Sequence, residues 1–200
     1  MQFKHLKWSL IVVSLLVAGK AGVSQVVPTA TAGNGQAFTV GAGGSSFNMD
    51  WGHGRMVGAT LWADWHPKQV PGRLYGLGLE AEARDISANP SSTQPPNFRQ
   101  DTAGGGVIYN WSHYPRFRPY GKFLISFGSI DFQIQRNPAY THETRTVYTS
   151  GGGFDYRVWG PVLVRADYEY QFWPSFLGNT LDPQGFTIGV AYAFGSGFGR

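Results

Sequence analysis

Apolar and polar residues alternate over long stretches of this sequence, most clearly near its C-terminal end. The segment 184–194 shows this alternation after a polar loop, and the segment 162–172 shows it over six apolar positions: Val162, Val164, Ala166, Tyr168, Tyr170 and Phe172. A period of two predicts a β-strand with one apolar and one polar face. Ten residues at about 3.3 Å each, tilted by about 40°, rise roughly 25 Å, which matches the apolar band of a transmembrane barrel.

The alternating pattern continues upstream, and no window after residue 36 has the period of a helix. Eight extended runs can be counted: 36–47, 55–66, 73–85, 101–113, 118–131, 146–158, 162–172 and 184–194. The connections after the second, fourth and sixth runs are predicted to be tight, and the others are longer and more polar. This rhythm is typical of up-and-down outer-membrane barrels. We therefore predict an all-β, eight-stranded antiparallel transmembrane β-barrel over residues 36–194, with the tight turns and both ends of the mature chain in the periplasm.

Residues 1–24 have the features of a signal peptide. A basic start precedes the apolar segment Trp8–Gly19, which is too short to span a bilayer as a helix. Small residues before the cleavage point predict processing after Ser24, with an uncleaved anchor as the alternative. Residues 25–35 then form a periplasmic lead-in, and residues 195–200 form a short C-terminal tail.

Composition removes several classes of function. The formal charge is +4, but three lysines lie in the leader, and from residue 25 onward 13 basic residues face 12 acidic ones. A nearly neutral mature chain gives no argument for nucleic-acid binding. The absence of cysteine excludes disulfides, thiolate catalysis and cysteine-ligated zinc.

Alternation alone fits both a membrane barrel and a soluble lipocalin-like barrel, which are inside-out versions of one pattern. The polar faces carry few charges and many small residues, whereas a solvated exterior is about a quarter or more charged. Aromatic residues near the ends of runs are typical of the girdles at membrane interfaces: Trp62, Trp65, Trp111, Tyr114, Tyr156, Trp159, Phe172 and Trp173. We therefore predict that the apolar faces meet lipid and that the polar faces line a narrow lumen.

The C-terminal motifs carry a resemblance to a known family. The run Arg165–Phe172, the loop Leu181–Gln184 and the closing strand Gly185–Phe194 resemble the small OmpA-like outer-membrane β-barrel family, without its peptidoglycan-binding domain. The resemblance implies a salt-bridge network that fills the lumen and serves structure or gating. Together with two further inward charges, Arg84 and Asp155, the predicted network comprises Glu80, Glu82, Arg84, Lys122, Asp155, Arg157, Arg165, Asp167 and Glu169.

The same resemblance implies an assembly signal in the last strand. Family members end at an aromatic residue that the barrel-assembly machinery reads. The matching residues here are Tyr192 and Phe194, and the tail 195–200 displaces them from the C-terminus.

We expect a non-enzymatic protein of a Gram-negative cell envelope, with a structural, adhesion or surface-interaction role. The alternatives are a small porin or ion channel, a lipid A-modifying barrel enzyme, and a soluble lipocalin-like ligand-binding barrel. Against an enzyme, Tyr168–Phe172 lacks the His and Ser of the lipid A deacylases, although His53 beside Asp50 matches the loop His of the palmitoyltransferases. No residues have metal-ligand spacing, so no cofactor, metal or catalytic site is predicted. The expected partners are outer-membrane lipid and lipopolysaccharide, the barrel-assembly machinery and an extracellular molecule at the long loops.

Overall fold

The computed structural model describes residues 37–50, 54–67, 74, 76–88, 98–111, 116–132, 142–176 and 178–194. The chain divides into two units, residues 1–33 and 34–200, and all the described strands belong to the second. The predicted signal peptide, lead-in and C-terminal tail lie outside the described residues. No helix among the residues described is both long and apolar enough to cross a membrane.

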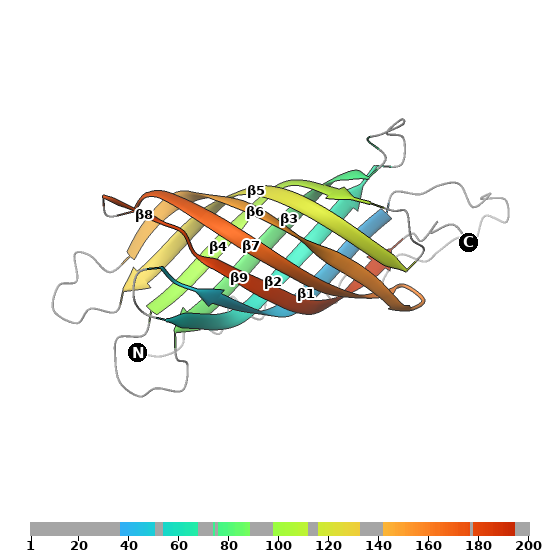
Figure 1. Cartoon of the computed structure of the whole chain (residues 1–200), viewed down its shortest axis with the longest axis horizontal. Helices are drawn as coiled ribbons and strands as arrows, with labels where there is room; N and C mark the ends of the chain where they lie inside the picture. Colours follow the sequence, from blue (N-terminus) through green and yellow to red (C-terminus); the bar gives the residue numbers. More distant parts are fainter. Residues whose placement is uncertain are drawn as a thin grey trace, which may run out of the picture. The chain divides into compact units, whose positions relative to one another are not determined.

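Nine strands account for nearly all of the described residues (Figure 1). They are β1 (Ala37–Asn48), β2 (Arg55–His66), β3 (Leu77–Ala88), β4 (Phe98–Asn110), β5 (Phe117–Phe132), β6 (His142–Trp159), β7 (Val162–Phe176), β8 (Asn179–Leu181) and β9 (Gln184–Phe194).

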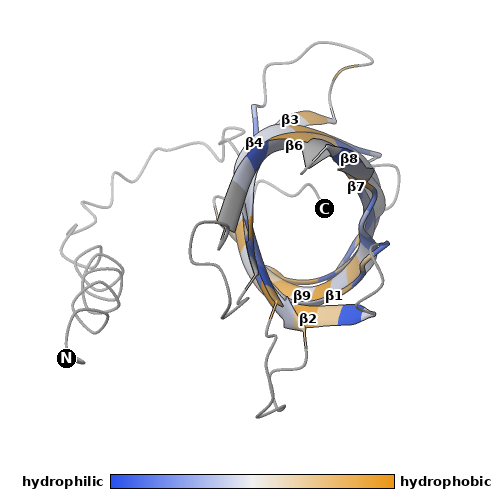
Figure 2. Cartoon of the chain, turned by 90° about the vertical axis from the view of Figure 1, so that its left-hand side faces the viewer, coloured by the Kyte–Doolittle hydropathy of each residue, from blue (hydrophilic) through white to orange (hydrophobic). Residues whose placement is uncertain are grey.

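The strands form a closed antiparallel barrel. Strands β1 to β7 pair in sequence order, and β9 pairs with both β7 and β1, which completes the ring seen in Figure 2. The short β8 pairs only with the end of β7 and extends that hairpin beyond the ring. The predicted eight-stranded antiparallel barrel is therefore confirmed.

The register determines the tilt of the strands. Following paired residues once around the barrel from Phe38 of β1 leads back to β1 at Asn48, ten residues further along. A stagger of ten over eight strands tilts them by about 40° from the barrel axis. At that tilt, ten residues rise about 25 Å, so these strands are long enough to cross the outer membrane.

Strand ends differ from the predicted runs, and the connections alternate in length less regularly than expected. The connection between β1 and β2 has six residues, and that between β2 and β3, predicted to be tight, has ten. Pro67 directly follows β2 and cannot donate a ladder hydrogen bond, which explains why the strand stops there. Below, "turn end" denotes the side of the β2–β3, β4–β5 and β6–β7 connections, and "loop end" denotes the opposite side.

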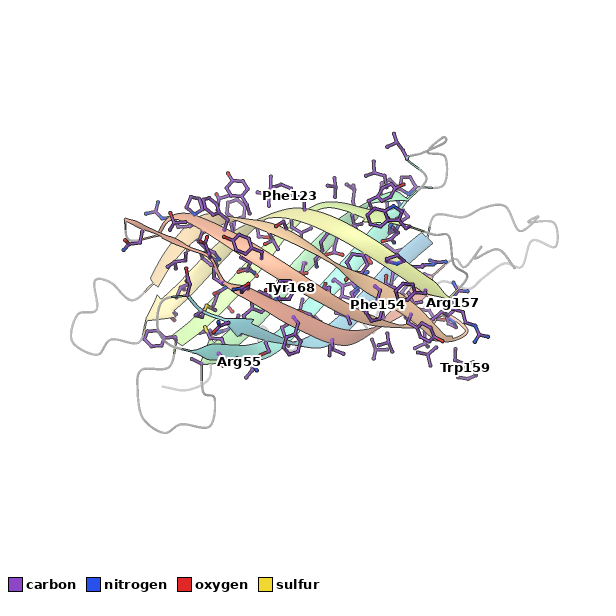
Figure 3. All side chains as sticks on the ribbon, in the orientation of Figure 1. Arg55, Phe123, Phe154, Arg157, Trp159 and Tyr168 are labelled. Carbon is purple, nitrogen blue, oxygen red and sulfur yellow. The ribbon has the colours of Figure 1, made fainter. Side chains whose placement is uncertain are left out.

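Apolar side chains cover the outside of the barrel. In β9, exposed and buried residues alternate without exception, and the outward Ile188 and Val190 are each 56% exposed. Figure 3 shows the Phe123 side chain outside the barrel wall, and the outward Tyr168 is 52% exposed. A protein with apolar residues outside and charges inside matches a lipid environment, so the predicted inside–outside assignment is confirmed.

Two tryptophans assigned to the aromatic girdle belong to the interior. Trp62 is 3% exposed and Trp173 is fully buried, because both occupy inward positions of their strands. Trp62 shares its face with Asp64, and Trp173 shares its face with Gln171. Their positions near the ends of the predicted runs suggested the aromatic girdle. The alternation within each strand, however, determines whether a side chain faces lipid or the lumen.

The outward face predicts a depth-dependent response to charge. Ile188 lies near the middle of β9, and Gln184 lies on the same outward face at its loop end. We expect Ile188→Arg to lower the free energy of unfolding by about 2–4 kcal/mol, and Gln184→Arg by about 0–1 kcal/mol. Urea unfolding in lipid vesicles measures both, and equal losses would contradict the assignment of β9 to the membrane.

Candidate functional site

Charged side chains from five strands meet inside the barrel. Each occupies an inward position in the alternating pattern of its strand, and each is at most 9% exposed. They are Asp64, Glu80, Glu82, Arg84, Lys122, Asp155, Arg165, Asp167 and Glu169. Burying one unpaired charge costs several kcal/mol or more, so these groups must neutralise one another.

Arg165 of β7 is the centre of the network on its turn-end side. Its guanidinium donates Nε and Nη2 to the two oxygens of Asp155, at 2.8 and 3.0 Å. Nη1 donates to Glu80 Oε2 at 2.9 Å, and Nη2 also contacts Asp64 Oδ2. The planar fork of an arginine suits such multiple carboxylate contacts, so Arg165 joins β2, β3, β6 and β7 across the lumen.

Lys122 of β5 occupies the middle of the network. Its ammonium lies 2.9 Å from Glu80 Oε1, 2.8 Å from Glu82 Oε2, 3.0 Å from Asp167 Oδ2 and 2.6 Å from Glu169 Oε1. Glu80 therefore contacts both Lys122 and Arg165, which makes the pairs one continuous network rather than separate bridges.

Arg84 of β3 completes the network toward the loop end. Its Nη2 lies 2.8 Å from Glu82 Oε1 and 2.6 Å from Glu169 Oε2, while its Nε donates to Thr60 Oγ1 at 2.9 Å. The guanidinium carbon lies 4.2 Å from the centre of the Phe47 ring, within the range of a cation–π contact. The ionic network thus ends against an aromatic side chain.

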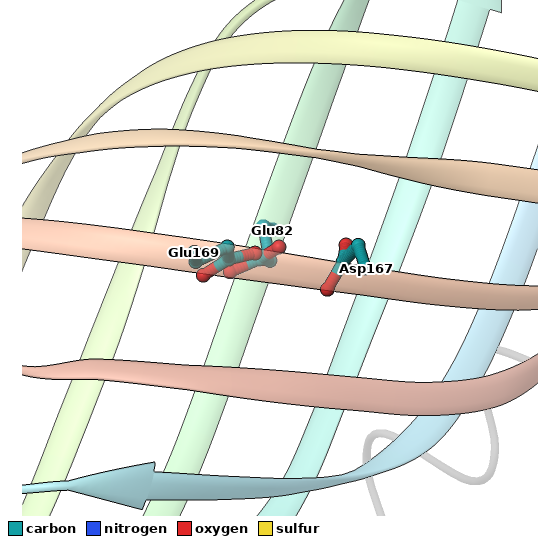
Figure 4. Close-up of side chains that lie close together, drawn as sticks. All are labelled: Glu82, Asp167 and Glu169. Carbon is teal, nitrogen blue, oxygen red and sulfur yellow. The ribbon is translucent and has the colours of Figure 1, made fainter.

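Three carboxylates of the network have the spacing of a metal site. One oxygen from each of Glu82, Asp167 and Glu169 lies within 4.8 Å of the others, and Figure 4 shows them clustered beside β7. The Lys122 ammonium lies between these carboxylates and contacts all three. The arrangement therefore already has its cation, and its chemistry is charge neutralisation.

Neutral polar groups flank the charges. The Tyr120 hydroxyl donates to Asp167 Oδ2 at 2.9 Å. Toward the loop end, Gln171 Oε1 accepts from Gln100 Nε2 at 2.9 Å and from Trp173 Nε1 at 3.1 Å. These bonds satisfy buried polar atoms and hold the ends of the network in one arrangement.

The structure brings eight of the nine predicted network residues together. The exception is Arg157, which lies half-buried at the turn-end rim near Trp159 (Figure 3), where its backbone N–H donates to Arg116 O at 2.8 Å. The predicted network of nine residues leaves out Asp64, although its alternation with Thr60 places it on the inward face of β2.

The predicted assembly residues are on the outside of the barrel. Tyr192 and Phe194 are 48% and 49% exposed, and their ring centres lie 4.7 Å apart. Phe194 also contacts Phe38 of the first strand, with ring centres 6.1 Å apart. These rings lie where the last strand meets the first.

A closed barrel of this size, apolar outside and filled with paired charges, has the architecture of a small outer-membrane protein. Residues 9–194 match the family described as "Outer membrane protein beta-barrel domain". The chain belongs to this family, and it is a protein of the outer membrane. A comparison with curated protein sequences finds no match.

Solved structures with the same fold include three small outer-membrane proteins. Neisserial surface protein A has a TM-score of 0.62 at 16% identity, covering 80% of this chain and 100% of its own. The attachment invasion locus protein Ail of Yersinia pestis has a TM-score of 0.52 at 14% identity, covering 80% and 97%. OprG of Pseudomonas aeruginosa has a TM-score of 0.52 at 12% identity, covering 79% and 95%. At these identities the likeness shows the fold.

Buried and exposed arginine pairs should differ in their effect on stability. Replacing Arg165 by Met leaves Asp64, Glu80 and Asp155 without their guanidinium, and we expect a loss of about 3–5 kcal/mol. Arg99 is the matched control, because it also contacts an aspartate, Asp85, through two nitrogens, but both side chains are more than half exposed.

For Arg99→Met we expect a loss of about 0–1 kcal/mol. Urea unfolding in the same lipid measures both variants. Equal, small losses would show that the lumen charges are hydrated rather than paired.

Proposed function

We propose that this protein is a non-enzymatic outer-membrane barrel with a closed lumen, which acts at the cell surface as a structural or interaction protein. The observation that supports the closed lumen is the paired network centred on Lys122 and Arg165, whose members are almost completely buried. The loops then become the part of the molecule that is available to partners, with lipid and lipopolysaccharide around the apolar band.

A porin is the main alternative, and the geometry argues against it. Eight strands enclose an interior that side chains can just fill. The charges that would line a pore here contact one another at 2.5–3.0 Å instead of facing open space. Ions would have to break these contacts to pass.

A lipid A-modifying enzyme needs a nucleophile and a base within hydrogen-bond reach on a lipid-accessible surface. In the stretch Tyr168–Phe172 of the late strand β7, the outward residues are Tyr168, Tyr170 and Phe172, which supply neither. Among the described side chains, the candidate base is His66. Its Nε2 lies 3.0 Å from Asn110 Nδ2. His53 lies outside the described residues.

The charge of the loop-end rim bears on the kind of partner. A structure of Ail is described as a complex with the heparin analogue sucrose octasulfate. In this chain the described loop-end rim carries five aspartates against three arginines: Asp50, Asp85, Asp101, Asp131 and Asp182, with Arg55, Arg99 and Arg145. A net negative rim does not attract a sulfated polymer, so a partner with basic groups fits it better.

The closed lumen predicts an electrically silent protein. Purified, refolded barrel in a planar lipid bilayer should give little or no steady conductance, because the paired charges leave no path for hydrated ions. The refolded state is verified by its heat-modifiable mobility in gel electrophoresis. Stable, large channels from the unmodified protein would replace this proposal with a porin.

The absence of cysteine allows a direct test of orientation. Asn179 is exposed at the loop end and Arg116 is exposed at the turn end, so each can be replaced singly by Cys. On intact cells, a membrane-impermeant maleimide should label the Asn179→Cys variant and spare Arg116→Cys until the outer membrane is permeabilised. Labelling of Arg116→Cys alone on intact cells would show that the turn end faces outward.

A further inference from the structure

Large apolar side chains encircle the lumen at the loop end, beyond the ionic network. Each of the strands β1 to β7 contributes one inward residue that is at most 6% exposed. These residues, called the apolar ring below, are Phe47, Met56, Ile86, Phe98, Ile130, Val147 and Trp173. They belong to two packed clusters, one on β1–β4 and one on β5–β8.

Glycines on the barrel wall make room for two aromatic side chains of the apolar ring, Trp173 and Phe47. A Cβ atom on Gly128 of β5 would lie only 2.8 Å from Trp173 Cζ2 and 2.6 Å from Val147 Cγ2. A Cβ atom on Gly185 of β9 would lie 2.6 Å from Phe47 Cγ. The Trp173 indole therefore extends from β7 to the barrel wall at β5. Phe47 of β1 covers β9, the strand of the closed barrel that contributes no residue to the apolar ring.

The turn end has no comparable ring. Its apolar cluster consists of Trp62, Leu163, Ala191 and Ala193, from only three strands, β2, β7 and β9. The other inward positions near that end carry half-buried polar side chains: His66, Asn110, Arg118 and Arg157. At the turn end, buried apolar residues such as Ile108 of β4 thus lie among polar side chains, whereas at the loop end each of the strands β1 to β7 supplies an apolar one.

An apolar constriction resists ions because water inside it has no hydrogen-bond partners, and an ion entering it must lose its hydration. An ionic network offers an ion substitute ligands, so its contacts can exchange. From the apolar residues of seven strands at the loop end and the mixture of polar and apolar residues at the turn end, we infer that the apolar ring is the main permeability seal of this barrel. The inference rests on the proposed closed lumen, and it assigns the larger barrier to the apolar ring, because ions could cross the ionic network by exchanging its contacts.

The test compares two tryptophans that are equally large and similarly buried. Trp173→Ala opens the ring, whereas Trp62→Ala removes the same volume beside Arg165, whose guanidinium carbon lies 5.0 Å from the Trp62 ring. In planar bilayers, Trp173→Ala should raise the integrated current at least about tenfold over the unmodified protein. Trp62→Ala should stay at the unmodified level, and Trp173→Phe should restore the seal.

A second variant covers the case in which Trp173→Ala does not fold. Ile130→Thr combined with Val147→Thr nearly preserves the shape of the ring and adds hydroxyl groups that hydrate it, so intermittent current is expected. Current from Trp62→Ala equal to that from the ring variants, or silence of the folded ring variants, would overturn the inference. Large channels from the unmodified protein would instead overturn the proposed function itself.

Discussion

A bilayer offers no hydrogen-bond partners, so every backbone amide and carbonyl within its apolar band must be paired inside the protein. This chain meets the requirement by closure, because β9 pairs with both β7 and β1 and leaves no strand edge in the ring of eight strands. Eight strands with a stagger of ten give a narrow interior. The remaining features, including the alternation of faces and the crowded lumen, follow from this closed geometry.

The narrow interior determines how charge is handled. Bulk water does not fit among the side chains, so an inward charge depends on partners from other strands. Lys122 and Arg165 have such partners on strands that are not their neighbours in the ring, as Glu80 of β3 contacts both. The network therefore braces the barrel across its diameter, while the backbone ladder holds it around its circumference. The apolar ring adds a third layer that needs no partners.

The fold was largely predictable, because a period of two in long runs has few other interpretations. The inward charges followed from the same period, and Asp64 could have been added by its alternation with Thr60. Trp62 and Trp173 were misplaced because aromatic residues suit both a lipid interface and a packed interior. Which carboxylate contacts which cation was not predictable, since those contacts join strands far apart in sequence and depend on the stagger of the closed barrel.

The link between the network and the register has a consequence for assembly. A strand that paired one residue out of register would turn its whole inward face toward lipid. For β5 this would move Lys122 from four carboxylates into hydrocarbon, and for β7 it would move Arg165, Asp167 and Glu169 together. Because Arg or Lys on the lipid side costs up to about 2–4 kcal/mol, the ionic residues penalise closures in which β5 or β7 is one residue out of register. The lumen charges thus favour the correct strand register during insertion, in addition to their contribution to the stability of the complete barrel.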